Sequence, residues 1–415
     1  MKIHYHSDCP FFAGCEKMLI NFWTDPLLRR QHEISFSYRQ SAEYTRGLYE
    51  HLTPDFPVFP LSLPAKNWPL KNFHYLPAVV SRIIRFMFRL ITNIPFLMFD
   101  IVILTRLLRQ IAPDLVHLNN GGYPAARSAR AAAIAARFAG VKKVVMVVNN
   151  LAVRYTGPDR WFDFPIDRLV VRATDRFVTG SQAAAHQLQE VLALKSDQVQ
   201  SIHNGIRSRA LTESVAQARR RLGVDVRFDG VVIGVVALME PRKGHRVLLE
   251  ALTILLEQNP LITQKLVVWL EGDGPLRGEL ESFVRLKKLS AVVHFIGKEK
   301  NVVDMMNALD ILVLPSIESE DFPNVTLEAM ALGKTVIASA LAGTPEQIVQ
   351  GETGILVEPG NAEALAKALS RLIEQPEWSK CLGAKGRERF FKMFTADIAV
   401  KNYIDLYHSL KEGVK

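Results

Sequence analysis

Residues 310–339 read DILVLPSIESEDFPNVTLEAMALGKTVIAS, and this stretch decides the fold. The apolar run Ile311–Leu314 predicts a buried parallel strand. Pro323 suits the first position of a helix, where its missing N–H costs nothing, and Gly333 suits the cap that ends it. A second apolar run at 336–338 completes a strand–loop–helix–strand unit, which indicates an α/β protein with a parallel sheet.

Two acidic residues in this unit are candidates for binding a ligand. Ligands of open parallel sheets bind beyond the carboxyl ends of the strands, where the loop with Glu320 lies. Glu328 follows in the second turn of the helix. Because a carboxylate accepts paired hydrogen bonds from vicinal hydroxyls, Glu328 suits a ribose and Glu320 a sugar ring. N–H groups at the helix start suit phosphate. The alternative is that Glu320 is a solvated loop acid and Glu328 a helix surface acid.

The spacing of these acids resembles a known signature. Two Glu separated by seven residues, with Phe322 after the first and EAMALG beginning at the second, resemble the motif of glycosyltransferase family 4. The resemblance implies the GT-B fold, in which two Rossmann-like, doubly wound parallel-sheet domains face each other across a cleft. It places Glu320 beside the donor sugar and Glu328 on the nucleotide ribose. Phe322, Asn324 and Val325 are the other donor-binding candidates of this stretch.

Size and composition are those of a globular protein with two domains. The 415 residues exceed what one core usually supports, so two domains of about 200 residues each are expected. The formal charge of +9 favours anionic partners, and because no nucleic-acid module is recognisable, no nucleic-acid partner is expected. The three cysteines form no metal pattern and no even disulfide set. The start MKIHYH has no apolar signal core, so a cytoplasmic location is expected.

The resemblance also gives domain boundaries. An acceptor-side Rossmann-like domain is expected over 1–203, a hinge over 204–230, and the donor-nucleotide domain over 231–392. Residues 393–415 are expected to form a helix that packs back on the first domain.

In the first domain, two residues match family positions with changes. The family's first loop has a Gly pair that approaches the donor phosphates, and here Gly14 remains with Ala13 before it. The apolar run 115–118 predicts a strand with a loop from Asn119. The family commonly has a His after the next strand, close to the reacting carbon, and Asn149 stands there. Asn orients a sugar but carries no proton at neutral pH. His117 is the alternative proton carrier, although an apolar run favours a core histidine.

In the second domain, Lys243 is the expected phosphate contact. The family form closest to this sequence has an Arg six residues before this Lys, and Ala237 stands there. Lys243 alone offers one point charge without the planar grip of arginine, and Arg242 is expected to point elsewhere. Backbone near Gly297 is where the family binds the nucleobase. No metal-binding acid motif stands out, and the resemblance implies a metal-independent reaction without a cofactor.

Two basic segments are candidates for a membrane or an acceptor. Residues 79–111 are apolar and interrupted by charge, with Arg82, Arg85 and Arg89 on one helical face. This pattern fits an amphipathic helix on an anionic membrane or a core helix with a solvated face. Five arginines lie between 154 and 176, which predicts a solvated face or a phosphate site: Arg154, Arg160, Arg168, Arg172 and Arg176.

The resemblance therefore implies a retaining glycosyltransferase that moves a sugar from a nucleotide-diphosphate sugar to a hydroxyl acceptor. A glycan or lipid-linked acceptor of cell-surface polysaccharide or glycolipid synthesis is expected, with peripheral binding to the inner face of the cytoplasmic membrane. Two alternatives stay open. The absence of the family's Arg and the presence of Asn149 at the His position keep open a non-catalytic nucleotide-sugar or membrane-binding subunit. The shared double-Rossmann plan keeps open a nucleotide-sugar epimerase on the same fold.

Overall fold

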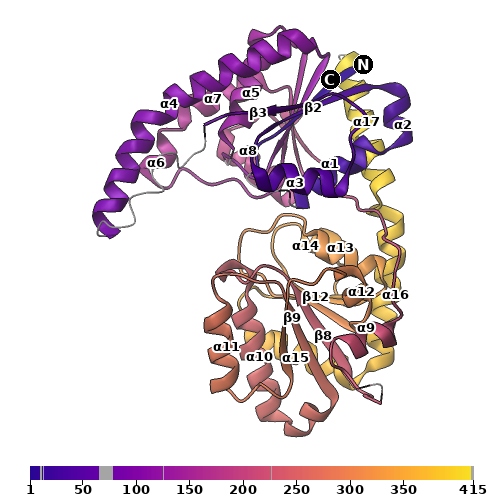
Figure 1. Ribbon diagram of the computed structural model, residues 1–415. Coiled ribbons are helices and arrows are strands. Elements are labelled where there is room, and N and C mark those ends of the chain that lie inside the picture. Colours follow the sequence, from indigo (N-terminus) through magenta and orange to yellow (C-terminus); the bar gives the residue numbers. More distant parts are fainter. Residues whose placement is uncertain (10–11, 13, 65–77, 125, 226, 413–415) are drawn as a thin grey trace. The chain divides into compact units, whose positions relative to one another are not determined.

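The computed structural model describes residues 1–9, 12, 14–64, 78–124, 126–225 and 227–412. The chain divides into two compact units (Figure 1). Unit 1 contains residues 1–203 and 400–415, and unit 2 contains residues 204–399.

In the described part of unit 1, seven parallel strands form a sheet in the order β3-β2-β1-β4-β5-β6-β7. The strands are β1 (Lys2–Ser7), β2 (Glu33–Arg39), β3 (Val58–Leu61), β4 (Leu115–Asn120), β5 (Lys143–Val148), β6 (Arg176–Thr179) and β7 (Val199–Ser201). Both faces of β5 are covered, since Val144 and Met146 belong to one core cluster and Val145 and Val147 to another. This double burial explains why the strand is a continuous apolar run.

Helices pack on both faces of this sheet. One face carries α4 (Ala78–Ile111), α5 (Arg127–Phe138), α7 (Phe164–Ala173) and α8 (Gln182–Leu192). The other carries α1 (Gly14–Trp23), α2 (Pro26–Gln31), α3 (Ala42–His51) and residues 400–410 of α17 (Ala396–Glu412). The short α6 (Pro158–Trp161) precedes α7. α4 continues through Pro95. Its arginines Arg82, Arg85 and Arg89 have side chains outside the described part of the structure.

In the described part of unit 2, six parallel strands have the order β10-β9-β8-β11-β12-β13. They are β8 (Val231–Val236), β9 (Leu266–Glu271), β10 (Val293–Gly297), β11 (Ile311–Leu314), β12 (Thr335–Ser339) and β13 (Ile355–Val357). One face packs on α10 (His245–Gln258), α11 (Arg277–Leu286) and α15 (Ala362–Glu374). The other packs on α9 (Val215–Arg221), α12 (Val302–Asn307), α13 (Asn324–Ala331) and the end of α16 (Pro376–Met393). The short α14 (Thr344–Gln347) follows β12.

The predicted α/β class with two parallel sheets is confirmed. Two local expectations are wrong by one or two residues. Pro323 is the cap that precedes α13 rather than its first helical residue, because its ψ of 124° is extended. β4 continues through Asn120 instead of ending at Leu118, because residues 115–120 all pair with β5. No helix in the described residues has the length and apolar character that a membrane crossing requires.

Candidate functional site

The loop after β11 turns the Glu320 side chain into the protein. Ser319 has a φ of 56°, a left-handed conformation that residues other than glycine rarely adopt. The next residue, Glu320, is 7% exposed, and its Oε1 accepts a hydrogen bond from the hydroxyl of Ser316 at 3.0 Å. This burial excludes the alternative that Glu320 is a solvated loop acid.

The turn before α10 brings two cations to this carboxylate. The ammonium of Lys243 forms an ion pair with Glu320 Oε1. Arg242 Nη1 lies 3.8 Å from the same oxygen and donates to the carbonyl of Ser319 at 3.3 Å. The expectation that Arg242 points elsewhere is therefore wrong. The reason is a backbone link, because Ile317 N–H donates to the Arg242 carbonyl at 2.8 Å and joins the turn to the loop.

Gly244 lets the turn and the loop pack against each other. Its φ is +66°, and a Cβ there would lie 1.8 Å from the carbonyl oxygen of Pro315. A larger residue would separate the two segments. Gly244 directly follows Lys243 in the sequence, and its lack of a side chain permits the close approach that puts Lys243 against Glu320.

The N-terminus of α13 follows the same loop. Asn324 and Val325 are its first two residues, so their N–H groups have no carbonyl partner within the helix. Glu328 lies one turn further and is half-buried. Asn204 fixes the entry to the helix, since its side-chain amide donates to the Phe322 carbonyl at 3.2 Å and to Asn324 Oδ1 at 3.3 Å. The ring of Phe322 is 4% exposed and belongs to the core.

Glu271, at the end of β9, is a further acid that the sequence analysis missed. Its carboxylate is buried and accepts a hydrogen bond from the N–H of Glu299 at 3.2 Å. Burial raises the pKa of the Glu271 carboxyl, and the negative charges of Glu299 and Glu328 act in the same direction. The available signal was an acid directly after a buried apolar strand. Nearby, Gly297 has a φ of +76°, and its carbonyl accepts from the N–H of Gly272 at 2.8 Å.

In unit 1, Asn149 lies in a chain of polar side chains at the carboxyl ends of β1, β4 and β5. Its amide donates to Asn119 Oδ1 at 2.8 Å and to the Asn120 carbonyl at 3.0 Å. Asn119 in turn lies 3.4 Å from Glu16 Oε1, which also accepts from the Ser7 hydroxyl at 3.1 Å. Glu16 is buried in the first turn of α1. Gly14 begins the same helix and is exposed.

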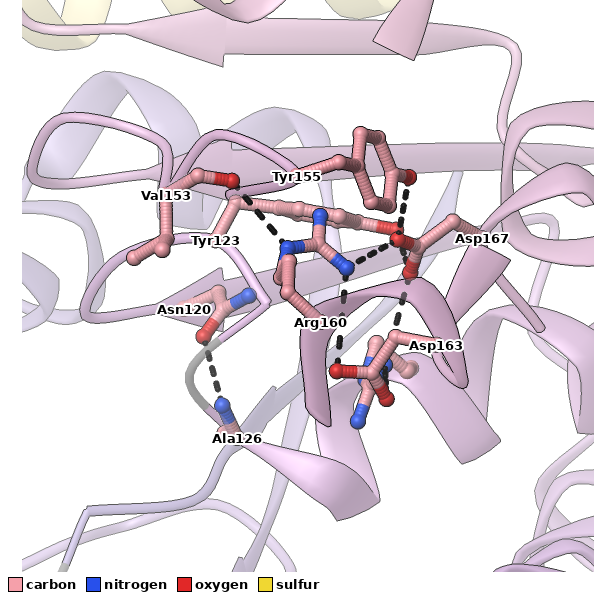
Figure 2. Close-up of polar contacts among 9 residues, drawn as sticks. Asn120, Tyr123, Ala126, Val153, Tyr155, Arg160, Asp163 and Asp167 are labelled. Atoms are coloured by element: carbon pink, nitrogen blue, oxygen red, sulfur yellow. Dashed lines mark hydrogen bonds and ion pairs between the residues drawn. The ribbon is translucent and has the colours of Figure 1, made fainter. Parts of the chain in front are cut away.

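A buried charge cluster holds the segment that follows Asn149 (Figure 2). Arg160 is buried and donates to Asp167 Oδ2 at 2.5 Å and to the Val153 carbonyl at 3.1 Å. The hydroxyls of Tyr123 and Tyr155 donate to the Asp167 carboxylate at 2.9 and 2.6 Å. The expectation that Arg160 belongs to a solvated face is wrong, because Asp167 pairs with it inside the protein.

Among the other four arginines of that set, Arg154 and Arg172 are exposed and match the expected solvated face, whereas Arg168 and Arg176 are half-buried. Arg154 is the more closely defined case. Its side chain is 60% exposed and pairs with Glu190 at 3.0 Å. Arg130, on α5, joins the buried cluster from a neighbouring helix, because it donates to Asp163 at 2.8 Å.

His117 is a core histidine. Its side chain is 1% exposed, and its Nδ1 lies 2.7 Å from the hydroxyl of Tyr407 on α17. Burial lowers the pKa of His117 to about 3, so the ring is neutral near pH 7. The preferred interpretation of His117 as a core residue is confirmed. In the described residues, no group of three or more His, Cys, Asp or Glu is arranged to hold a metal ion.

Two family profiles match the chain in succession. The profile for Glycosyltransferase Family 4 matches residues 43–209, and the profile for Glycosyl transferases group 1 matches residues 226–389. D-inositol 3-phosphate glycosyltransferase from Streptomyces scabiei is 31% identical over 226 residues, which are 52% of this chain and 50% of that protein. The chain thus spans about half the length of the first curated relatives that it matches.

Solved structures are similar over nearly the whole chain. HepE from Anabaena in complex with UDP superposes with a TM-score of 0.76 at 19% identity, covering 99% of this chain and 100% of that one. The same protein has been solved with UDP-glucose, with a TM-score of 0.74. The lipopolysaccharide outer core galactosyltransferase WaaB has a TM-score of 0.67 at 15% identity, covering 99% of both chains. The fold that the resemblance implied, GT-B, is confirmed.

Proposed function

The chain belongs to glycosyltransferase family 4, and we propose that it transfers a sugar from a nucleotide-diphosphate sugar to a hydroxyl of an acceptor. The anomeric configuration is retained. The observation that supports this most is the meeting of Lys243 and Glu320 beside the N-terminus of α13, because it joins a phosphate-binding cation and a hydroxyl-binding acid in one site.

In unit 2, each group of the site binds a different part of the nucleotide-sugar donor. Glu328 accepts the ribose hydroxyls, and Glu320 accepts hydroxyls of the transferred sugar. Lys243 offsets the charge that grows on the leaving diphosphate, because an ammonium placed in advance needs no reorganisation during the reaction. Its present contact with Glu320 holds the ammonium in the site until the phosphates arrive.

Main-chain groups complete the donor site. The N–H groups of Asn324 and Val325 face the phosphates at the positive end of α13. Phe322 contributes through its main chain, because its ring packs against Phe394 with the ring centroids 5.6 Å apart. Backbone near Gly297 receives the nucleobase.

In unit 1, the resemblance assigns Gly14 to the donor phosphates and Asn149 to the orientation of the sugar. The bonds of Asn149 support such a role, because its amide donates to Asn119 and to the Asn120 carbonyl and thereby fixes the direction of the side chain.

UDP is the nucleotide that we propose first, because HepE was solved with UDP and with UDP-glucose. A glycan or lipid-linked acceptor of polysaccharide or lipopolysaccharide synthesis follows from the resemblance and agrees with the likeness to WaaB. An anionic membrane surface is the proposed partner of 79–111. Exposed apolar side chains on α4, such as Ile94 at 59% and Met98 at 62%, support peripheral binding to the inner face of the cytoplasmic membrane.

A non-catalytic nucleotide-sugar-binding subunit remains the second candidate. The position of the family's phosphate arginine is Ala237, and the position of its histidine is Asn149. An epimerase is a weaker candidate, since the Glu pair with seven residues between and EAMALG favour transfer. Analysis of the products separates transfer from epimerisation.

The first test is a thermal-shift screen without added metal, using UDP, GDP, ADP, CMP and their sugar conjugates. A ligand that binds the folded state raises the melting temperature. We expect one nucleotide and its conjugates to do so, and wild-type protein to hydrolyse that donor slowly while Glu320→Gln does not. No shift with any compound would favour the non-catalytic subunit, as would a shift without hydrolysis or transfer.

A further inference from the structure

The imidazole of His245 is buried in unit 2 and has no hydrogen-bond partner in the part of the chain that the structure describes. The side chain is 1% exposed, and neither Nδ1 nor Nε2 has a partner. Among the described residues, it is the one histidine with both ring nitrogens buried and unpartnered. An unpaired polar group in the interior destabilises the folded state, so the protein retains this ring at a cost in stability.

The ring lies at the end of α10 that faces the candidate donor site. His245 is the first residue of this 14-residue helix. Helical side chains tilt toward the N-terminus of their helix, so the ring extends toward the segment that carries Lys243. Burial lowers the pKa of His245 to about 4, and the positive charge of Lys243, two residues earlier in the chain, acts in the same direction. The ring is therefore neutral at pH 7 and offers one N–H donor and one acceptor.

The surroundings of this helix end suit an anion. The N-cap of α10 is Gly244, and no side chain of the described residues caps this helix. The first N–H groups of the helix therefore add hydrogen-bond donors to its positive end. Glu320, the acid that pairs with Lys243, also accepts a hydrogen bond from Ser316. A phosphate that displaced Glu320 from Lys243 would give the imidazole N–H an acceptor.

We propose that His245 donates a hydrogen bond to a phosphate oxygen of a nucleoside diphosphate bound at the N-terminus of α10, beside Lys243. This inference rests on the proposed function and deepens it. It supplies one of the phosphate contacts that the family obtains from the arginine absent at Ala237. A single imidazole N–H gives one bond where a guanidinium gives two, so His245 replaces that arginine only in part.

The test compares three variants by isothermal titration calorimetry without added metal. His245→Leu keeps the volume and removes both ring nitrogens, His245→Gln restores an N–H donor, and His186→Gln changes an exposed histidine of unit 1 as a control. Three ligands serve as probes. The first is inorganic pyrophosphate, the second is whichever of UDP, GDP, ADP and CDP binds most tightly, and the third is the nucleoside of that nucleoside diphosphate.

We expect His245→Leu to lower the affinity for pyrophosphate and for the nucleoside diphosphate about ten- to a hundredfold, because a hydrogen bond to a charged group is lost. The affinity for the nucleoside should not change. His245→Gln should fall between this variant and the wild type, and His186→Gln should match the wild type. Without ligand, His245→Leu should melt at or above the wild-type temperature, since an unpaired polar group has been removed.

Unchanged diphosphate binding in His245→Leu would overturn the inference and point to a buried water as the partner of the ring. An equal loss for nucleoside and diphosphate would also overturn it, because it would indicate a general distortion. Should His245→Leu melt well below the wild type, the diphosphate-to-nucleoside ratio in His245→Gln decides the matter. If the wild type binds no diphosphate and no pyrophosphate, the proposed function falls together with this inference.

Discussion

Lys243 and Glu320 are 77 residues apart in the sequence, and their side chains form an ion pair in unit 2. Both are largely buried, with 15% and 9% of the side chains exposed. Each fixes the other in one arrangement, which is how a site is held ready for a ligand. The backbone contacts of Gly244 and Ile317 place the two segments, so the ion pair follows from the fold.

We predict that Lys243→Ala lowers the free energy of unfolding by about 1–3 kcal/mol, because the buried Glu320 carboxylate loses a charged partner. In the Glu320→Gln background the same substitution should cost less, and the difference is the coupling energy of the pair. Denaturant unfolding of the wild type, the two single variants and the double variant measures this coupling energy. Lys380→Ala, which removes a surface pair with Glu377, is the control and should cost under about 1 kcal/mol. Equal costs in both backgrounds would contradict the pairing.

Glu328→Ala should weaken nucleotide binding by about 1–3 kcal/mol, because the ribose hydroxyls lose a charged acceptor. Calorimetric titration with the nucleotide identified by thermal shift measures the change in Kd. Glu377→Ala, an exposed acid on α16, is the matched control and should bind like the wild type. An unchanged Kd in Glu328→Ala would remove the ribose assignment.

The local units of the fold could be predicted from the sequence, whereas contacts between distant segments could not. The strand Ile311–Leu314 and the helix with Glu328 are encoded by nearby apolar spacing and by glycine and proline. Arg242 was misassigned because its contact with the Glu320 loop depends on how two segments pack. Glu271 was missed because one acid after a strand has no signature of its own.

Arg160 shows the limit of counting charges. Five arginines in 23 residues predict a positive surface, but periodicity does not reveal that Asp163 and Asp167 share the interior with Arg160. The same limit applies to Glu16 and Asn119, whose contact joins β4 to α1 across more than a hundred residues of sequence. Resemblance supplied Asn149 as a candidate, and the structure supplies its partners.

Asp167→Asn should cost about 3–5 kcal/mol of the free energy of unfolding, because buried Arg160 and Arg130 lose the charge that they share. Glu190→Gln, which removes the partner of exposed Arg154, should cost no more than about 1 kcal/mol. Denaturant unfolding of both variants under the same conditions makes the comparison. Similar small losses in the two would mean that the cluster in Figure 2 does not stabilise unit 1.

The buried histidines of unit 1 should make its stability depend on pH. Burial lowers the pKa of His4 and His117 to about 3 and that of His6 to about 4, against 6.5 for the free side chain. Below pH 6.5 the unfolded chain binds protons that the folded unit does not take up. The contribution of each histidine to the free energy of unfolding is therefore fully present above pH 6.5. It is lost as the pH falls toward 4, by about 1.4 kcal/mol per pH unit for each histidine.

His117→Gln removes one of these groups, so the free energy of unfolding of unit 1 should fall less steeply with decreasing pH, by about 1.4 kcal/mol per pH unit. Hydrogen exchange of the β4 amides reports this free energy for unit 1, which contains His117. It is measured by mass spectrometry between pH 7 and pH 5 and corrected for intrinsic exchange. His186 is exposed on the surface of unit 1, so His186→Gln is the matched control and should keep the wild-type slope. A slope that His117→Gln leaves unchanged would show that His117 is protonated in the folded protein, against its burial beside Tyr407.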